Sequence, residues 1–195
     1  MSTEVSAPPS VERTGEQRIA RLFGLTGDAW MRHANPISVW TRFSCLSLVA
    51  LAVWSREWIG WLSVVAVAAA VVWMMVNPLL FGVPSSTKNW ASKGVFGERI
   101  WADRKQVEIP EQFTSRVPNL ANLYSAIGLA IAMYGLIALE LWPVVGGILI
   151  AHGAKLWYID RMVLLFEDMK QRDHTYASWE WARDPDDGST ARELV

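Results

Sequence analysis

The ionisable side chains that could do chemistry gather where long apolar runs end. Asp160 and Glu167 stand seven positions apart, so on a helix they share a face, and Arg161 and Asp168 do the same. Carboxylates at this spacing can hold a metal ion or pair with bases of other segments. A metal site would need converging histidines or more carboxylates, and His33 is the only histidine nearby. Ion pairing is therefore the simpler interpretation, and no metal is predicted.

These residues belong to a wider polar set. Its bases could hold an anion, and its carboxylates and histidine could act as acids, bases or ligands, with Asp103 as a further candidate. The candidate set consists of Arg32, His33, Asn35, Arg42, Asn89, Lys93, Glu98, Arg99, Asp160, Arg161, Glu167 and Asp168.

His152 stands apart because it lies inside an apolar run. A polar side chain there is costly in lipid and usually faces the interior of a helix bundle. A hydrogen bond to Ser125 or to another helix is one interpretation, and a proton relay or ligand role is the other. One histidine without a matched second is weak support for a haem, so no cofactor is predicted. Cys45, the only cysteine, is interpreted as a small buried hydrophobic residue.

The elements that must position these residues are apolar helices. Trp58 to Val76 contains no charge and can cross a hydrocarbon core of ~30 Å. Ile37 to Ser55 is a second span, with Arg42 near one end, where its side chain can reach the interface. Only Arg56 and Glu57 separate these two spans, at about 37–55 and 58–76, which predicts a tight hairpin.

A second hairpin repeats this plan, with spans at about 120–141 and 143–160. Gly128-xxx-Ala132 and Gly147-xxx-Ala151 are pairs of small residues that allow close helix packing in lipid. The fourth span continues into a charged helix on the cytoplasmic side. The predicted fold is therefore all-α, with four transmembrane helices arranged as two hairpins.

Two Asn-Pro pairs are interpreted as helix punctuation. Asn35-Pro36 breaks the chain before the first span, because proline disfavours helix at the preceding residue, and Ser38 could help to cap that span. Asn77-Pro78 is expected to end the second span.

The central segment, residues 88–104, is too aromatic for a simple linker. Trp90 and Trp101 are eleven positions apart, hence on nearly the same face of a helix. We expect a helical segment on the membrane surface, with its bases toward anionic lipid headgroups, although Gly94 and Gly97 weaken the helix. The membrane domain, 27–172, then lies between a polar, largely disordered tail at 1–26 and a polar tail at 173–195.

Charge orients the predicted domain. The hairpin turns contain one base, Arg56, whereas the two flanks and the central segment contain many. By the positive-inside rule both termini and the centre face the cytoplasm. The first ~30 residues lack the apolar stretch of a signal peptide, so none is expected.

A soluble helical bundle is the alternative. Hydrophobic residues make up 52% of the chain and charged residues 19%, but the apolar ones lie in two blocks. A helix that is apolar all round is buried or spans a membrane, and 195 residues leave too little protein to cover two such hairpins.

Nucleic-acid binding has no support beyond basic charge that a membrane explains better.

Four motifs resemble those of a family of small prokaryotic membrane proteins known only as a domain of unknown function. The resemblance covers roughly residues 27–169, and its first motif is fairly specific. It implies a four-span protein of the prokaryotic plasma (inner) membrane, and it brings no activity, cofactor or catalytic residue. The motifs are His33-Ala34-Asn35-Pro36-Ile37-Ser38-Val39-Trp40-Thr41-Arg42, Asn77-Pro78, Asn89-Trp90-Ala91-Ser92-Lys93 and Asp160-Arg161-Met162-Val163.

Three functions remain open. The favoured one is a non-catalytic scaffold, accessory subunit or lipid-interacting protein, with the bilayer and a membrane protein or a second copy as partners, because no catalytic constellation stands out. The second is a membrane enzyme that acts on a lipid headgroup or other interfacial substrate through the polar set. The third is a small oligomeric transporter, for which the path-lining residues are few: Asn122, Ser125, Glu140 and His152.

Overall fold

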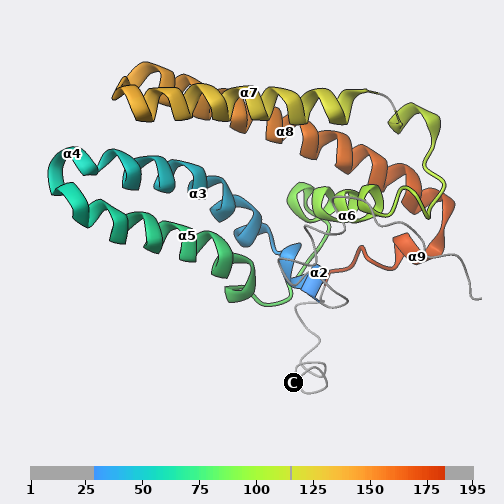
Figure 1. Cartoon of the computed structure of the whole chain (residues 1–195). Coiled ribbons are helices and arrows are strands. Elements are labelled where there is room, and N and C mark those ends of the chain that lie inside the picture. Colours follow the sequence, from blue (N-terminus) through green and yellow to red (C-terminus); the bar gives the residue numbers. More distant parts are fainter. Residues whose placement is uncertain (1–28, 115, 183–195) are drawn as a thin grey trace, which may run out of the picture.

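Two helical hairpins and a layer of shorter helices make up the computed structural model, which describes residues 29–114 and 116–182. Within these ranges the chain forms helices and no strand apart from one isolated bridge. The turns of both hairpins lie at one end of the molecule, and the shorter helices outside the hairpins lie at the other (Figure 1). The predicted tail at 1–26 lies outside the described residues.

The first hairpin pairs α3 (Pro36–Trp54) with α5 (Ser63–Leu80), after the short α2 (Ala29–His33). Asn35 begins α3, because its side chain accepts a hydrogen bond from the Ile37 N–H at 3.0 Å. Asn35, rather than Ser38, is therefore the capping residue.

The turn of this hairpin is longer than predicted. It contains α4 (Arg56–Ile59) and the 3-10 helix η1 (Gly60–Leu62), so α5 begins at Ser63. Gly60 has a φ of 56°, a conformation that glycine adopts without the steric cost of a side chain. The predicted span at 58–76 therefore starts too early.

The same helix also ends later than predicted. Pro78 lies inside α5, which continues to Leu80. Asn77 is fully buried against α3, and its Nδ2 donates to the Thr41 hydroxyl at 2.9 Å. Asn77 thus joins the two helices of the hairpin instead of ending one of them.

The second hairpin pairs α7 (Val117–Ala138) with α8 (Leu141–Arg172). A Cβ atom at Gly128 would lie 2.6 Å from the Ala151 backbone nitrogen, so only glycine permits this approach. The small residues of the two helices pack together as predicted. α8 is one continuous helix of 32 residues, which confirms that the fourth apolar run continues into the charged segment.

The central segment forms α6 (Trp90–Ala102), but this helix does not lie free on a surface. It packs along the second half of α8 and buries most of its residues (Figure 1). Trp101 is only 6% exposed, and a Cβ atom at Gly97 would overlap the Met162 carbonyl. The glycines that weaken an isolated helix are what allow α6 to approach α8.

The larger hydrophobic core lies between α6 and α8, near the end opposite the turns. It contains Phe96, Ile100, Met162, Leu165 and Phe166, each at most 1% exposed. This core fixes the position of α6 relative to α8 and hence the position of the polar residues that α6 carries.

Two segments are long and apolar enough to cross a membrane, Pro36–Leu80 and Glu111–Ala138, with mean hydropathies of 2.3 and 1.7. The first is folded in half and contains both α3 and α5. Only 11% and 28% of their most apolar windows are buried, unlike the core helix of a soluble protein. α8 does not meet the same criterion, because His152 and Lys155 interrupt its apolar half.

The described part of the predicted C-terminal tail, 173–182, folds back onto α6. After the 3-10 helix η2 (Glu111–Phe113) and the α7–α8 hairpin, α9 (His174–Ala177) reverses the chain. The Thr87 hydroxyl then donates to the Trp179 carbonyl at 2.9 Å, and the Trp179 ring lies 5.7 Å from that of Phe96.

Candidate functional site

The candidate site is a cavity between the two hairpins, and α6 contributes residues to its lining. Its volume is about 360 Å³, which is within the usual range of small-ligand sites. α3 meets α7 and α8 only sparsely, so the cavity separates them along part of their length. The cavity is partly open to the exterior, and Leu129 in its lining is 45% exposed.

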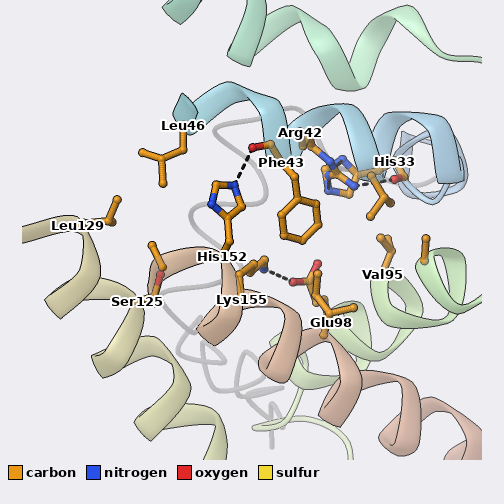
Figure 2. A pocket seen from close by; sticks show the side chains of 14 residues that line it. His33, Arg42, Phe43, Leu46, Val95, Glu98, Ser125, Leu129, His152 and Lys155 are labelled. Atoms are coloured by element: carbon orange, nitrogen blue, oxygen red, sulfur yellow. Dashed lines mark hydrogen bonds and ion pairs between the residues drawn. The ribbon is translucent and has the colours of Figure 1, made fainter. Parts of the chain in front are cut away.

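Arg42 and His33 form one side of its polar end (Figure 2). The Arg42 Nη1 lies 2.9 Å from the His33 Nδ1 and also contacts the Nε2, while its Nη2 donates to the His33 carbonyl at 3.2 Å. Burial and the positive charge of Arg42 lower the pKa of His33 to about 3. His33 is therefore neutral at pH 7 and can accept a hydrogen bond from the guanidinium.

Glu98 of α6 and Lys155 of α8 form the other side of the polar end (Figure 2). The Lys155 Nζ donates to the Glu98 Oε1 at 2.5 Å. Burial alone would raise the pKa of Glu98, but the charge of Lys155, its hydrogen bond and the charge of Arg42 outweigh burial and lower it. Glu98 is thus ionised and compensates Lys155.

His152 lies about one helical turn before Lys155 on α8 and points across the cavity toward α3 (Figure 2). Its Nε2 lies 2.7 Å from the Phe43 carbonyl, and its Nδ1 lies 2.9 Å from the Ile148 carbonyl. His152 therefore makes the interhelical hydrogen bond expected of a polar residue in an apolar run, but its partner is a backbone carbonyl of α3 rather than Ser125. It spans the gap between the hairpins.

The other end of the cavity is apolar. Phe43 and Leu46 of α3 lie across from Leu129 of α7, with Ser125 and His152 as polar groups nearby (Figure 2). The cavity thus has an apolar part between the hairpins and a charged part above α6, a combination that suits a molecule with an apolar chain and a polar head.

Several predicted site residues lie away from this cavity, in ion pairs. The Lys93 Nζ lies 2.6 Å from Glu167 and 3.5 Å from Glu180. Lys170 contacts the same two carboxylates. This network fastens the residues after α9 to α6 and α8, which is the pairing between segments expected for Glu167.

Other candidates form ion pairs within α8 or lie over an aromatic ring. Asp160 pairs with Arg161 at 2.9 Å, and Asp168 pairs with Arg172 at 2.6 Å. The Arg99 guanidinium lies 4.4 Å from the centre of the Trp179 ring. These charged groups are not brought to the cavity.

The two asparagines of the predicted set begin helices. Asn35 also donates to the Gly82 carbonyl at 3.0 Å, which ties the ends of the first hairpin together. Asn89 caps α6 by accepting from the Ser92 N–H at 2.9 Å. Arg32 is exposed and does not line the cavity.

The apolar half of the cavity was not predicted from the sequence. Phe43, Leu46 and Leu129 look like ordinary lipid-facing residues in an apolar run. Helical spacing does carry a signal on α8, because Ala151, His152 and Lys155 fall on one face. Nothing in the local sequence indicates that this face meets α3 across a gap.

The arrangement can bind and orient a ligand, and it offers groups for proton transfer in His33 and Glu98. Among residues 29–114 and 116–182, no three or more His, Cys, Asp or Glu side chains come together in a group that could hold a metal ion. The described acids and bases of the cavity instead hold one another in place.

A family model covers residues 14–183, which is most of the chain. No curated protein matches the chain, and no solved structure does. The matching model is described as a family of unknown function (DUF6653), and the chain belongs to this family.

Proposed function

We propose that this protein is a multi-pass membrane protein that holds an amphiphile, a molecule with an apolar chain and a polar head, between its two hairpins without converting it. The observation that carries the proposal is the cavity, which is apolar along Leu46 and Leu129 and charged at Arg42, Glu98 and Lys155. Apolar clefts with a few convergent polar groups are the usual form of ligand sites.

The exposed surface supports a membrane setting. Large apolar side chains cover the outer faces of α5 and α7, such as Val64 at 68% and Ile137 at 70% exposed. Trp61 and Trp142, at 78% and 81% exposed, stand at the two hairpin turns, and tryptophan favours the membrane–water interface. In this proposal all four long helices cross the bilayer and α6 lies on the cytoplasmic side, in the plasma membrane.

The cavity then opens toward the lipid, since Leu129 is exposed on an apolar helix. Its charged end lies at the level of α6, where headgroups and water meet the protein. An amphiphile can enter sideways between the hairpins with its head toward Arg42 and its chain along Leu129. No large rearrangement is needed, because the cavity already has a ligand-sized volume.

The test is native mass spectrometry of the full chain purified in mild detergent. We expect the wild type to retain an amphiphile, and Leu129→Trp to lose most of it because the larger indole narrows the apolar part of the cavity. Leu123→Trp is the matched control, since Leu123 is on the same helix, 54% exposed, and does not line the cavity.

Retention by the wild type and by Leu123→Trp, with loss in Leu129→Trp, supports the proposal. An empty wild type, or equal retention by all three proteins, contradicts it.

The enzyme hypothesis remains a second candidate because neutral His33 and ionised Glu98 reach the same cavity. It differs in one observable: an enzyme returns a chemically changed amphiphile. Recovery of the bound molecule unchanged after incubation, with no new product mass in the spectrum, favours binding over catalysis.

A further inference from the structure

We infer that the polar end of the cavity selects an anionic head, a carboxylate or a phosphate, and that Arg42 is the residue that binds it. This inference rests on the proposed function and names the class of ligand for the same site. It begins with the charges around the cavity.

The two cations at the polar end have different partners. Lys155 is paired with Glu98 at 2.5 Å. Arg42 lies in no ion pair with any carboxylate of the residues that the structure describes, and its two terminal nitrogens contact His33. The guanidinium is thus hydrogen-bonded but not neutralised.

Among the described residues, no second carboxylate at this end balances the two cations, although the charge of Arg42 also acts on Glu98. His33 is neutral, and His152 directs both ring nitrogens at carbonyl oxygens. Within residues 29–114 and 116–182, Glu98 is the one carboxylate that lines the cavity, and it is paired with Lys155. The described lining of the cavity therefore has more positive than negative charge, with Arg42 and Lys155 against Glu98.

A partly buried charge is costly unless it is paired, and a guanidinium fits a carboxylate or phosphate with two parallel hydrogen bonds. Arg42 sits on α3 in an apolar helix, one residue before Phe43, which lines the apolar part of the cavity. An anion bound to Arg42 can therefore continue into the apolar cavity only if it carries an apolar chain.

The contact between Arg42 and His33 adds to this selectivity. A neutral histidine that accepts from the guanidinium fixes its orientation without cancelling its charge. We therefore assign His33 as a positioning residue for Arg42.

Binding to full-length protein in nanodiscs of a zwitterionic lipid, at pH 7, tests the inference. Each pair of probes shares its apolar chains and differs in the head: palmitate against hexadecanol, and phosphatidic acid against diacylglycerol. We expect the anionic member of at least one pair to bind about tenfold or more tightly to the wild type. Acetate and inorganic phosphate, used alone, should not bind measurably, because they lack the chain.

Arg42→Gln should reduce this preference to less than about threefold while hexadecanol or diacylglycerol still binds, which shows that the cavity is intact. Arg42→Lys keeps the charge and should retain part of the preference. Arg32→Gln is the matched control, since it removes the same charge from an exposed residue outside the cavity and should leave the preference unchanged.

Equal binding of anionic and neutral probes by the wild type overturns the inference but leaves the proposed function standing. A preference that survives in Arg42→Gln, or falls equally in Arg32→Gln, also overturns it. Binding of acetate or phosphate as tightly as the long-chain probes would make this a small-anion site and overturns it too. If no probe binds the wild type, both the inference and the proposed function fail.

Discussion

At the scale of single residues, Arg42 and His33 have opposite electrostatic roles in one contact. Arg42 is a charged residue in an apolar helix, whereas His33 is neutral and accepts a hydrogen bond from it. The arrangement is stable only while the histidine stays neutral, because protonation would place two cations side by side.

This contact predicts that acid destabilises the protein. The pKa of His33 is about 3 in the folded protein and 6.5 in the reference state, so its stabilising contribution is complete above pH 6.5 and falls as the pH drops toward 3. At pH 5 the loss is up to about 2 kcal/mol. Thermal unfolding in detergent at pH 7.5, 6 and 5 measures it.

His33→Gln separates this effect from others, because glutamine can accept from Arg42 but does not titrate. We expect a flatter dependence of the unfolding midpoint on pH between 7.5 and 5 in this variant. The carboxylates whose pKa values are lowered, Glu98, Glu167 and Glu180, lose their contributions below their usual value of 4.5, outside this window. Parallel curves for wild type and variant would refute the assignment.

The sequence predicted part of this site. Arg42, His33 and Glu98 belong to the candidate set because polar side chains that could do chemistry gather where the apolar runs end, and all three line the cavity. The same reasoning also chose Asp160 and Glu167, which pair elsewhere. Their spacing shows that they share a helix face, but which face meets the cavity depends on how α6 packs on α8.

At the scale of elements, close contact between α6 and α8 determines the position of Glu98. Gly97 precedes it, and a Cβ atom there would overlap the Met162 backbone, so α6 lies close against α8. Glycine costs helix stability in isolation, but the approach it permits allows Glu98 to reach Lys155 at 2.5 Å.

Gly97→Ala should therefore separate the two helices. A methyl group at this position would overlap the Met162 carbonyl, a backbone atom that cannot turn aside. We expect a loss of stability of at least about 1–3 kcal/mol, as for other overpacked cores. A lower unfolding midpoint in detergent measures the effect.

Gly153→Ala is the matched control because nothing lies within 4 Å of the added atom and the residue is in the middle of α8. It should leave stability unchanged or raise it by up to about 1 kcal/mol through helix propensity. Equal effects of the two substitutions would show that helix propensity, and not the contact with Met162, is what matters at Gly97.

Helices were more predictable than the connections between them. The apolar runs place α3 and α7 within three residues of their observed bounds, because burial and hydrogen bonding in such runs favour long helices. The turn at Gly60 and the continuation of α5 past Pro78 depend on one backbone conformation and on the buried Asn77, which periodicity does not report.

At the scale of the whole molecule, the two hairpins are joined at both ends and separated in the middle. Near the turns, the Arg56 guanidinium donates to the Leu136 carbonyl and, at 3.3 Å, to the Ile137 carbonyl. At the other end the core of α6 and α8 holds α2 and α3. The cavity lies between these two joints, where His152 alone reaches across by a hydrogen bond to Phe43 among the described residues.

The folding back of residues 179–182 could not be predicted, because it depends on Thr87 and Phe96, more than eighty residues away in sequence. A short polar segment with two tryptophans has no periodic pattern, and its composition resembles that of a tail. Long-range contacts of this kind become visible only once α6 has a fixed position.

The proposed topology predicts which surfaces a reagent outside the cell can reach. Basic residues are concentrated at the end that contains α6, and the turns contain Arg56 alone, so the positive-inside rule places both turns outside. In a Cys45→Ser background, Glu57→Cys and Glu140→Cys should react with a membrane-impermeant thiol reagent in intact cells. Lys88→Cys and Gln171→Cys, which are also at exposed positions, should react only after the cells are opened.

Labelling of one turn but not the other would mean that a hairpin does not cross the membrane. Labelling of Lys88→Cys from outside would reverse the orientation and place Arg42 at the external surface.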